Sequence, residues 1–112
     1  MLQIIIADRK LTEVNNLLKE AGVGGMSYHR IDGRGRVKPQ PIAVGRGVMH
    51  YTPEFIPRLK VEVVVRDDQV DDLIAKLADR VGGDPSAGGK IFVLDVAEAV
   101  DLVTKKRGQS II

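Results

Sequence analysis

The order of apolar and polar positions divides the chain into two similar halves, each predicting a strand, a helix and a second strand. Residues 2–7 form a short apolar run that is typical of a buried strand. In residues 59–65 every odd position is apolar, which places those side chains on one face of a strand. A segment with apolar residues at helical spacing follows each of these strands. The two helical stripes consist of Leu11, Val14, Leu17, Leu18 and Ala21 in the first half, and of Val70, Leu73, Ile74, Leu77 and Val81 in the second.

The remaining elements carry weaker patterns. Residues 26–31 and 91–95 are predicted to be the returning strands of the two halves, and residues 100–103 a short final strand. Asp67 and Asp68 are expected to supply the N-cap and a favourable negative charge at the start of the second helix. This order matches the α+β, ferredoxin-like split βαβ sandwich, in which an antiparallel sheet carries both helices on one face.

Two connections are longer, or richer in glycine, than such a domain requires. Residues 33–52 are rich in Gly, Pro and Arg and show neither a helical nor a strand period, so we expect a segment without regular structure. Loops of this length in compact domains are commonly functional. Residues 82–89 form the second connection, where a short turn would suffice. Both connections are therefore candidate functional segments.

Composition and charge narrow the class of protein. The 112 residues, 44% of them hydrophobic and 29% charged, are ordinary usage for one globular domain. The absence of cysteine excludes disulfides, thiolate metal sites and cysteine nucleophiles. The apolar run near the N-terminus is too short for a signal peptide or a membrane span, so a cytoplasmic protein is expected. The net charge is only +2, but basic residues gather in residues 30–46 and 105–107, which suits a small anion better than a nucleic-acid duplex.

Signals for catalysis are weak. His29 and His50 are the only histidines, and neither has a partner at metal-ligand spacing, so each is expected to be an ordinary surface or sheet residue. No carboxylate paired with Glu62 for acid–base chemistry is evident. Ser86 and Ser110 stand in no nucleophile motif. We therefore expect a protein that is not an enzyme and that has no dedicated metal site.

Two glycine-rich segments indicate phosphate binding more strongly. The segments Gly33-Arg34-Gly35-Arg36 and Gly88-Gly89-Lys90 match neither a dinucleotide fingerprint nor a Walker A ending. Glycine nevertheless lets backbone N–H groups approach phosphate oxygens, and a neighbouring Arg or Lys adds charge-assisted hydrogen bonds. In a split βαβ sheet the first segment follows the second strand and the second precedes the fourth. The topology therefore predicts that both segments flank one cleft.

The same residues carry a resemblance to a known family. Residues 51–65 (YTPEFIPRLKVEVVV) resemble the stretch that leads from the long T-loop into the third strand of PII nitrogen-regulatory proteins. Residues 89–93 (GKIFV) resemble the C-terminal signature of that family, and residues 33–36 (GRGR) resemble its T-loop base. The resemblance covers nearly the whole chain in order and spacing. It implies a single PII-like domain over residues 1–112, with a T-loop at about 36–52, a B-loop at about 82–89 and a C-terminal segment at 96–112.

The resemblance also implies a function and a set of site residues. It implies a homotrimer that binds ATP or ADP in clefts between subunits. Its T-loop would contact a membrane transporter, such as an ammonium channel, or a metabolic enzyme, and no nucleic acid. The positions that match the family's nucleotide cleft are Gly33, Gly35, Arg36, Glu62, Val64, Gly88, Gly89 and Lys90. The positions that match its effector pocket are Val37, Lys38 and Arg58, and Tyr51 lies where some relatives carry a nucleotidylated tyrosine.

Several positions depart from the family pattern. Val37 stands where the family has a glutamine whose carbonyl oxygen binds Mg²⁺, so we expect weak binding of 2-oxoglutarate by the Mg²⁺-bridged route. Asp101 and Val103 stand where the family has two arginines that reach the phosphates from the neighbouring subunit. Residues 85–88 lack the usual Lys and Asp of the glycine loop. Nucleotide preference and effector are therefore open at this point.

Three other interpretations stay open. One is a divergent PII-like sensor of ADP, AMP or bicarbonate that serves a pathway other than nitrogen. Another is a ferredoxin-like RNA-binding domain, but such a domain needs aromatic stacking residues on its sheet, and only 4% of this chain is aromatic, with no Trp. An acylphosphatase-like enzyme shares the predicted topology, although topology alone does not give function.

Overall fold

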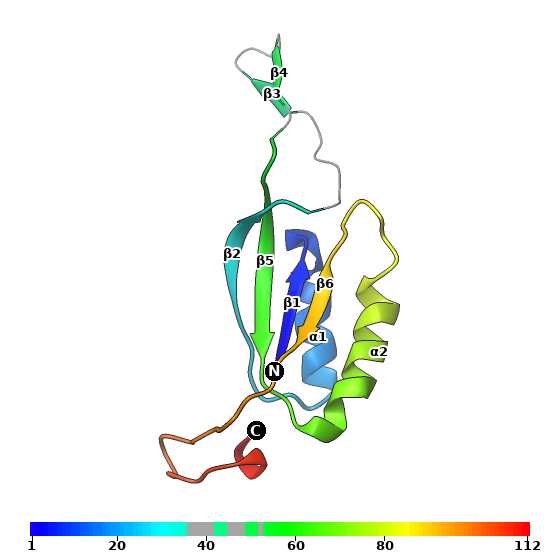
Figure 1. The fold of residues 1–112 in the computed structure, drawn as a ribbon. Helices are drawn as coiled ribbons and strands as arrows, with labels where there is room; N and C mark the ends of the chain where they lie inside the picture. The colour runs from blue at the N-terminus through cyan, green and yellow to red at the C-terminus, as the bar shows by residue number, and fades with distance from the viewer. Residues whose placement is uncertain (36–41, 45–48, 52) are drawn as a thin grey trace.

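A four-stranded antiparallel sheet forms the centre of the computed structural model, which describes residues 1–35, 42–44, 49–51 and 53–112. The strands are β1 (Leu2–Ile6), β2 (Ser27–Gly33), β5 (Ile56–Val63) and β6 (Lys90–Val93), in the order β2-β5-β1-β6 (Figure 1). Each half of the chain therefore contributes one inner and one edge strand. This is the predicted ferredoxin-like α+β arrangement.

The two helices cover one face of this sheet. α1 (Leu11–Glu20) follows a 3-10 turn at Asp8–Lys10, and α2 (Val70–Val81) follows a 3-10 turn at Asp67–Gln69. The predicted stripes pack against the inward side chains of β1 and β5 and are buried in part, because strand alternation turns every second residue of the strands toward the helices. The buried core consists of Leu2, Ile4, Ile6, Val14, Leu17, Leu18, Leu59, Val61, Val63, Val65, Leu73 and Leu77.

The start of the second helical segment differs from the prediction that Asp67 or Asp68 caps it. The cap position belongs to Arg66, whose backbone N–H donates to Oε1 of Gln69 at 3.1 Å. Asp67 and Asp68 lie one and two positions later, in the first turn, where their negative charge still interacts favourably with the positive end of the helix. The side chain of Gln69 therefore accepts the N–H of the cap residue itself, whereas the expected carboxylate cap would accept N–H groups of the first turn.

Part of the segment predicted to lack regular structure is a hairpin. β3 (Ile42–Val44) pairs antiparallel with β4 (Met49–Tyr51), with the backbone of Ile42 opposite that of Tyr51 and the backbone of Val44 opposite that of Met49. Apolar and aromatic residues at these positions favour strand pairing, although three residues are too few to show a period. Figure 1 shows the hairpin extending beyond the end of the four-stranded sheet.

The predicted strand at residues 100–103 is wrong. Only an isolated bridge joins Val100 to Arg107, and a turn lies between them. The carboxylate of Asp101 produces this turn, because Oδ1 accepts the backbone N–H groups of Val103 at 2.7 Å and Thr104 at 2.9 Å. A side-chain acceptor of this kind competes with strand pairing. In the part of the chain that the structure describes, no helix is long and apolar enough to cross a membrane.

Candidate functional site

A pocket of about 340 Å³ opens on the sheet face that the helices leave uncovered, at the end of the sheet nearest the hairpin. Antiparallel pairing explains its composition. Ile5 pairs with Lys90 on one side, and Ile31 pairs with Arg58 on the other, so all four side chains lie on the outward face. The lining comprises Ile5, Ile31, Gly33, Arg34, Gly35, Ile56, Arg58, Gly88, Gly89 and Lys90.

The pocket combines an apolar floor with cationic walls. Ile5, Ile31 and Ile56 form the apolar part, and the cations are Arg34, Arg58 and Lys90. Nη1 of Arg34 forms an exposed ion pair with Oε1 of Glu54 at 3.0 Å. None of the described residues that line the pocket carries a carboxylate. This combination suits an anion that also presents an apolar or flat surface.

The glycine loop approaches the sheet so closely that a side chain would not fit. Gly88 and Gly89 have positive φ angles of 62° and 118°, a region that L side chains rarely adopt. A Cβ atom at position 89 would lie 2.8 Å from the carbonyl oxygen of Ile5. The N–H of Gly88 already donates to the carbonyl oxygen of Asp84 at 3.2 Å. The two glycines therefore let the backbone form one wall of the pocket.

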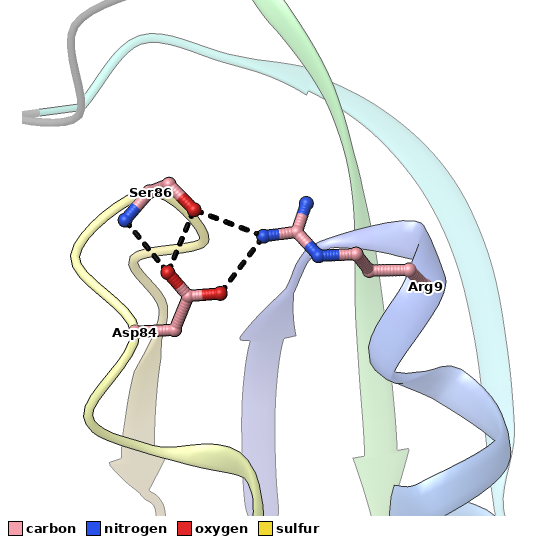
Figure 2. A network of polar contacts seen from close by, with 3 residues as sticks. All are labelled: Arg9, Asp84 and Ser86. Carbon is pink, nitrogen blue, oxygen red and sulfur yellow. Dashed lines mark hydrogen bonds and ion pairs between the residues drawn. The ribbon is translucent and has the colours of Figure 1, made fainter.

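Asp84 holds the rest of this loop in place (Figure 2). Its Oδ1 accepts the backbone N–H of Ser86 at 3.0 Å and the hydroxyl of Ser86 at 2.6 Å, and its Oδ2 accepts Nη2 of Arg9 at 3.0 Å. The hydrogen bond from the Ser86 hydroxyl, followed by that from Arg9, holds the pKa of Asp84 well below its usual range. At neutral pH the carboxylate is therefore charged, and both of its oxygens accept hydrogen bonds.

Comparison with known proteins decides the family. The family model described as nitrogen regulatory protein P-II matches residues 1–106. The chain belongs to the P-II family. Curated proteins named nitrogen regulatory protein P-II are similar to it over nearly their whole length. The relative from Cereibacter sphaeroides is 34% identical over 108 residues, which cover 96% of this chain and 95% of the relative. The relative from Microchaete diplosiphon is 38% identical over 106 residues, covering 95% and 93% respectively, and that from Pasteurella multocida is 32% identical over 111 residues, covering 99% and 97%.

Membership of the P-II family confirms three predictions made from the sequence. The family resemblance is correct, and the described strands and helices have the α+β arrangement that it implied. P-II proteins are signalling proteins of nitrogen regulation and not enzymes, as the weak catalytic signals indicated. The assignment of residues 1–112 to a single domain with its three segments stays a prediction.

The structure brings together most of the described residues that were predicted for the site. Gly33, Gly35, Arg58, Gly88, Gly89 and Lys90 line the one pocket. Glu62 lies on the same outward face, but further along β5, where Nε2 of Gln3 contacts its carboxylate at 3.5 Å. Val64 lines a different cavity of about 330 Å³ near the C-terminal segment. Within one copy, the predicted nucleotide positions therefore fall into two groups.

For four of the predicted site residues, the structure describes only the backbone or nothing. Arg36, Val37 and Lys38 lie outside the described residues. Tyr51 belongs to β4, and its backbone pairs with that of Ile42. Their proposed roles in phosphate binding, effector binding and modification stay predictions.

Sequence reasoning missed two parts of the site. It did not assign the apolar floor, because Ile5 lies inside a continuous apolar run that hides the alternation between the two sheet faces. Pairing Ile5 with Lys90 in the expected topology would have revealed it. It also missed the contact between Arg9 and Asp84, which no local pattern shows because 75 positions separate the two residues.

Proposed function

We propose that this P-II protein is a trimeric signal-transduction protein that binds an adenine nucleotide, ATP or ADP, in clefts between subunits. Residues 36–52 act as the T-loop and regulate a target of nitrogen metabolism, either an ammonium transporter or an enzyme. The observation that carries the proposal is the pocket that joins both glycine segments to Arg58 and Lys90. The proposal places the protein in the cytoplasm.

The charge and shape of the pocket support phosphate binding. Arg58 on β5 and Lys90 on β6 lie on either side of β1, with which both strands pair, and both residues line the pocket, so both cations are available to one anion. Arg36 lies directly after Gly35 in the chain and adds a third cation in this proposal. Charge-assisted hydrogen bonds from Arg and Lys are the strong contacts of phosphate sites.

The separation of the predicted positions supports a cleft shared between copies. Glu62 lies four residues beyond Arg58 on β5, a distance of about 13 Å along a strand. In the proposal, Glu62 and Val64 serve the adenine side and Arg36 and Lys90 serve the phosphates. The outward face exposes Phe92, and the chain that follows β6 exposes Leu94 and Val96, which a second copy would cover.

Calorimetry tests the proposal directly. ATP, ADP and AMP are titrated into the protein, each with and without Mg²⁺ and 2-oxoglutarate. Binding of ATP or ADP at one site per chain is expected. Light scattering on the same sample gives the mass of the assembly. Absence of binding by all three nucleotides would overturn the nucleotide assignment.

A second candidate rests on the C-terminal turn. Asp101 and Val103 offer no cation for phosphate. The carboxylate of Asp101 accepts two backbone N–H groups of its own turn, and Val103 is 91% exposed. Fewer cations favour a smaller or less charged anion than ATP. The candidate is a P-II-like sensor of ADP, AMP or bicarbonate in another pathway. Preference for AMP over ATP and ADP in the same titrations, or binding of bicarbonate in an additional titration, would favour it.

A further inference from the structure

We propose that Arg9, Asp84 and Ser86, called here the Arg9 cluster, position the glycine loop at the pocket and so set its affinity for phosphate groups. None of the three residues lines the pocket. Arg9 is therefore a positioning residue that acts through Asp84 and Ser86 on Gly88 and Gly89. The inference deepens the proposed function and rests on it.

The local sequence explains how the loop closes on Asp84. Asp followed by Pro favours the start of a turn, since the side chain accepts backbone N–H groups and the proline ring fixes φ. Here Oδ1 of Asp84 accepts the N–H of Ser86 at 3.0 Å. The carbonyl oxygen of Asp84 accepts the N–H groups of Ala87 at 3.1 Å and Gly88 at 3.2 Å. One residue therefore holds the backbone up to the first glycine of the pocket.

Arg9 ties this turn to the first strand of the sheet. It lies in the 3-10 turn directly after β1, and its Nη2 donates to Oδ2 of Asp84 at 3.0 Å and to Oγ of Ser86 at 3.2 Å (Figure 2). Further along the loop, Gly89 lies against the carbonyl oxygen of Ile5 on the same strand. The loop thus meets the end of β1 at two points, the contacts of Arg9 and the close approach of Gly89, with Gly88 between them. These two points fix where the pocket wall stands relative to Lys90.

The Arg9 cluster also neutralises the acid nearest to the pocket in the loop. A free carboxylate four residues before Gly88 would repel a phosphate. Asp84 instead faces Arg9 and two donor groups of Ser86. Loss of Arg9 is expected to weaken phosphate binding both by releasing the loop and by leaving this charge unpaired.

The exposure of the contact predicts a local effect. The side chains of Arg9 and Asp84 are 57% and 35% exposed, and exposed ion pairs contribute little to global stability. A change at Arg9 should therefore alter the loop and its ligand without unfolding the domain. The matched control is Arg80→Gln, which breaks another exposed pair, that of Arg80 with Glu20 at 2.6 Å, between α1 and α2 and away from the pocket.

The experiment compares the unmodified protein with Arg9→Gln, Asp84→Asn, Arg9→Lys, the double variant of Arg9→Gln with Asp84→Asn, and the Arg80→Gln control. ATP affinity is measured by calorimetry, and amide hydrogen exchange at Ser86, Ala87 and Gly88 is measured without ligand. We expect Arg9→Gln and Asp84→Asn each to weaken ATP binding about three- to tenfold. Exchange at the three amides should accelerate in both variants, while the melting temperature of Arg9→Gln stays within the range of the control. Asp84→Asn also loses its two contacts with Ser86, so it should melt somewhat lower. Arg9→Lys, which keeps the charge, should recover part of the affinity, and the double variant should lose no more than the worse single one.

Three results would overturn the inference. The first is unchanged exchange and affinity in both single variants. The second is faster exchange across the whole domain with a lowered melting temperature in Arg9→Gln, which would mean a general structural role for Arg9. The third is full additivity in the double variant. If the unmodified protein binds none of ATP, ADP and AMP, the proposed function and the affinity part fail together. The exchange rates then still decide whether the Arg9 cluster holds the loop.

Discussion

Gly89 lies so close to β1 that a Cβ atom at this position would stand 2.8 Å from the carbonyl oxygen of Ile5. Its φ angle of 118° is also one that side chains rarely adopt. The backbone of the loop that precedes β6 therefore lies directly against the backbone of β1, with no side chain between them. The shape of the pocket depends on this contact, because Ile5 and Gly89 both line it.

Replacing Gly89 by Ala should destabilise the protein and distort the pocket. Strain at a left-handed position costs about 1–3 kcal/mol, and the contact with Ile5 adds to it because backbone cannot yield as a flexible side chain can. The free energy of unfolding in urea measures the effect. Gly24→Ala is the control, since Gly24 has open space around its Cβ position and no positive φ. Equal stability of the two variants would contradict the prediction.

Removing Lys90 or Arg36 should weaken nucleotide binding. Each substitution by Ala removes a charge-assisted contact, which is about tenfold or more in affinity. Lys90 lines the pocket, whereas Arg36 is a prediction from the sequence alone. Calorimetry with ATP gives the result, and Lys76→Ala, which removes a lysine paired with Asp72 on α2, is the control. Unchanged affinity in both variants would place the phosphates elsewhere, for example against residues 105–107.

Replacing Phe92 by Glu should dissociate the proposed trimer. Phe92 pairs with Gln3 on the face opposite the helices, and its side chain is 48% exposed in one copy. A second copy packed on that face would have to bury the new charge without a partner, which is costly. Light scattering at micromolar concentration should show a trimer for the unmodified protein and a smaller species for the variant. Asn16→Glu, on the exposed side of α1, should leave the mass unchanged.

The strands and helices were predictable because burial imposes a period on the sequence. Leu59, Val61 and Val63 alternate with polar residues, and the structure buries all three. The turn at Asp101 was not predictable from apolar content, since residues 100–103 are mostly apolar. A single carboxylate that accepts two backbone N–H groups outweighed the strand pattern.

The pocket was predictable in its backbone but not in all of its side chains. Topology alone brings the segments that contain Gly33 and Gly89 to the same end of the sheet. The contact between Arg9 and Asp84 depends on how two turns are placed relative to each other in space. Local residue propensities contain no information about that placement. Contacts between exposed polar residues far apart in the chain leave no periodic signal.

Replacing Val37 by Gln should strengthen the binding of 2-oxoglutarate to the protein saturated with Mg²⁺ and ATP. Mg²⁺ requires hard oxygen ligands in near-octahedral geometry, and the side chain of valine has only methyl groups. Glutamine restores the carbonyl oxygen that the P-II resemblance implies at this position. Titration of 2-oxoglutarate by calorimetry measures the change, and Val37→Leu is the control of similar size without an oxygen. Low-micromolar binding by the unmodified protein would contradict the premise that Val37 weakens the site.

The stability of the protein should fall in acid, in part through Asp84. The Ser86 hydroxyl, Arg9 and the Ser86 N–H lower the pKa of Asp84 in the folded protein, so the folded state binds this proton more weakly than the unfolded chain. The resulting stabilisation is fully present above the ordinary carboxyl pKa of about 4 and is lost progressively as the pH falls below it. Asp84→Asn removes the titrating group. The variant should therefore be less stable than the unmodified protein at pH 7, and the difference should shrink as the pH approaches 3.

Urea unfolding at several pH values between 7 and 3 measures this difference in stability. Asp79→Asn removes an exposed carboxylate of α2 outside the Arg9 cluster and serves as the control. A difference between Asp84→Asn and the unmodified protein that stays constant over this range, or grows as the pH falls, would show that the charge of Asp84 is not what stabilises the loop.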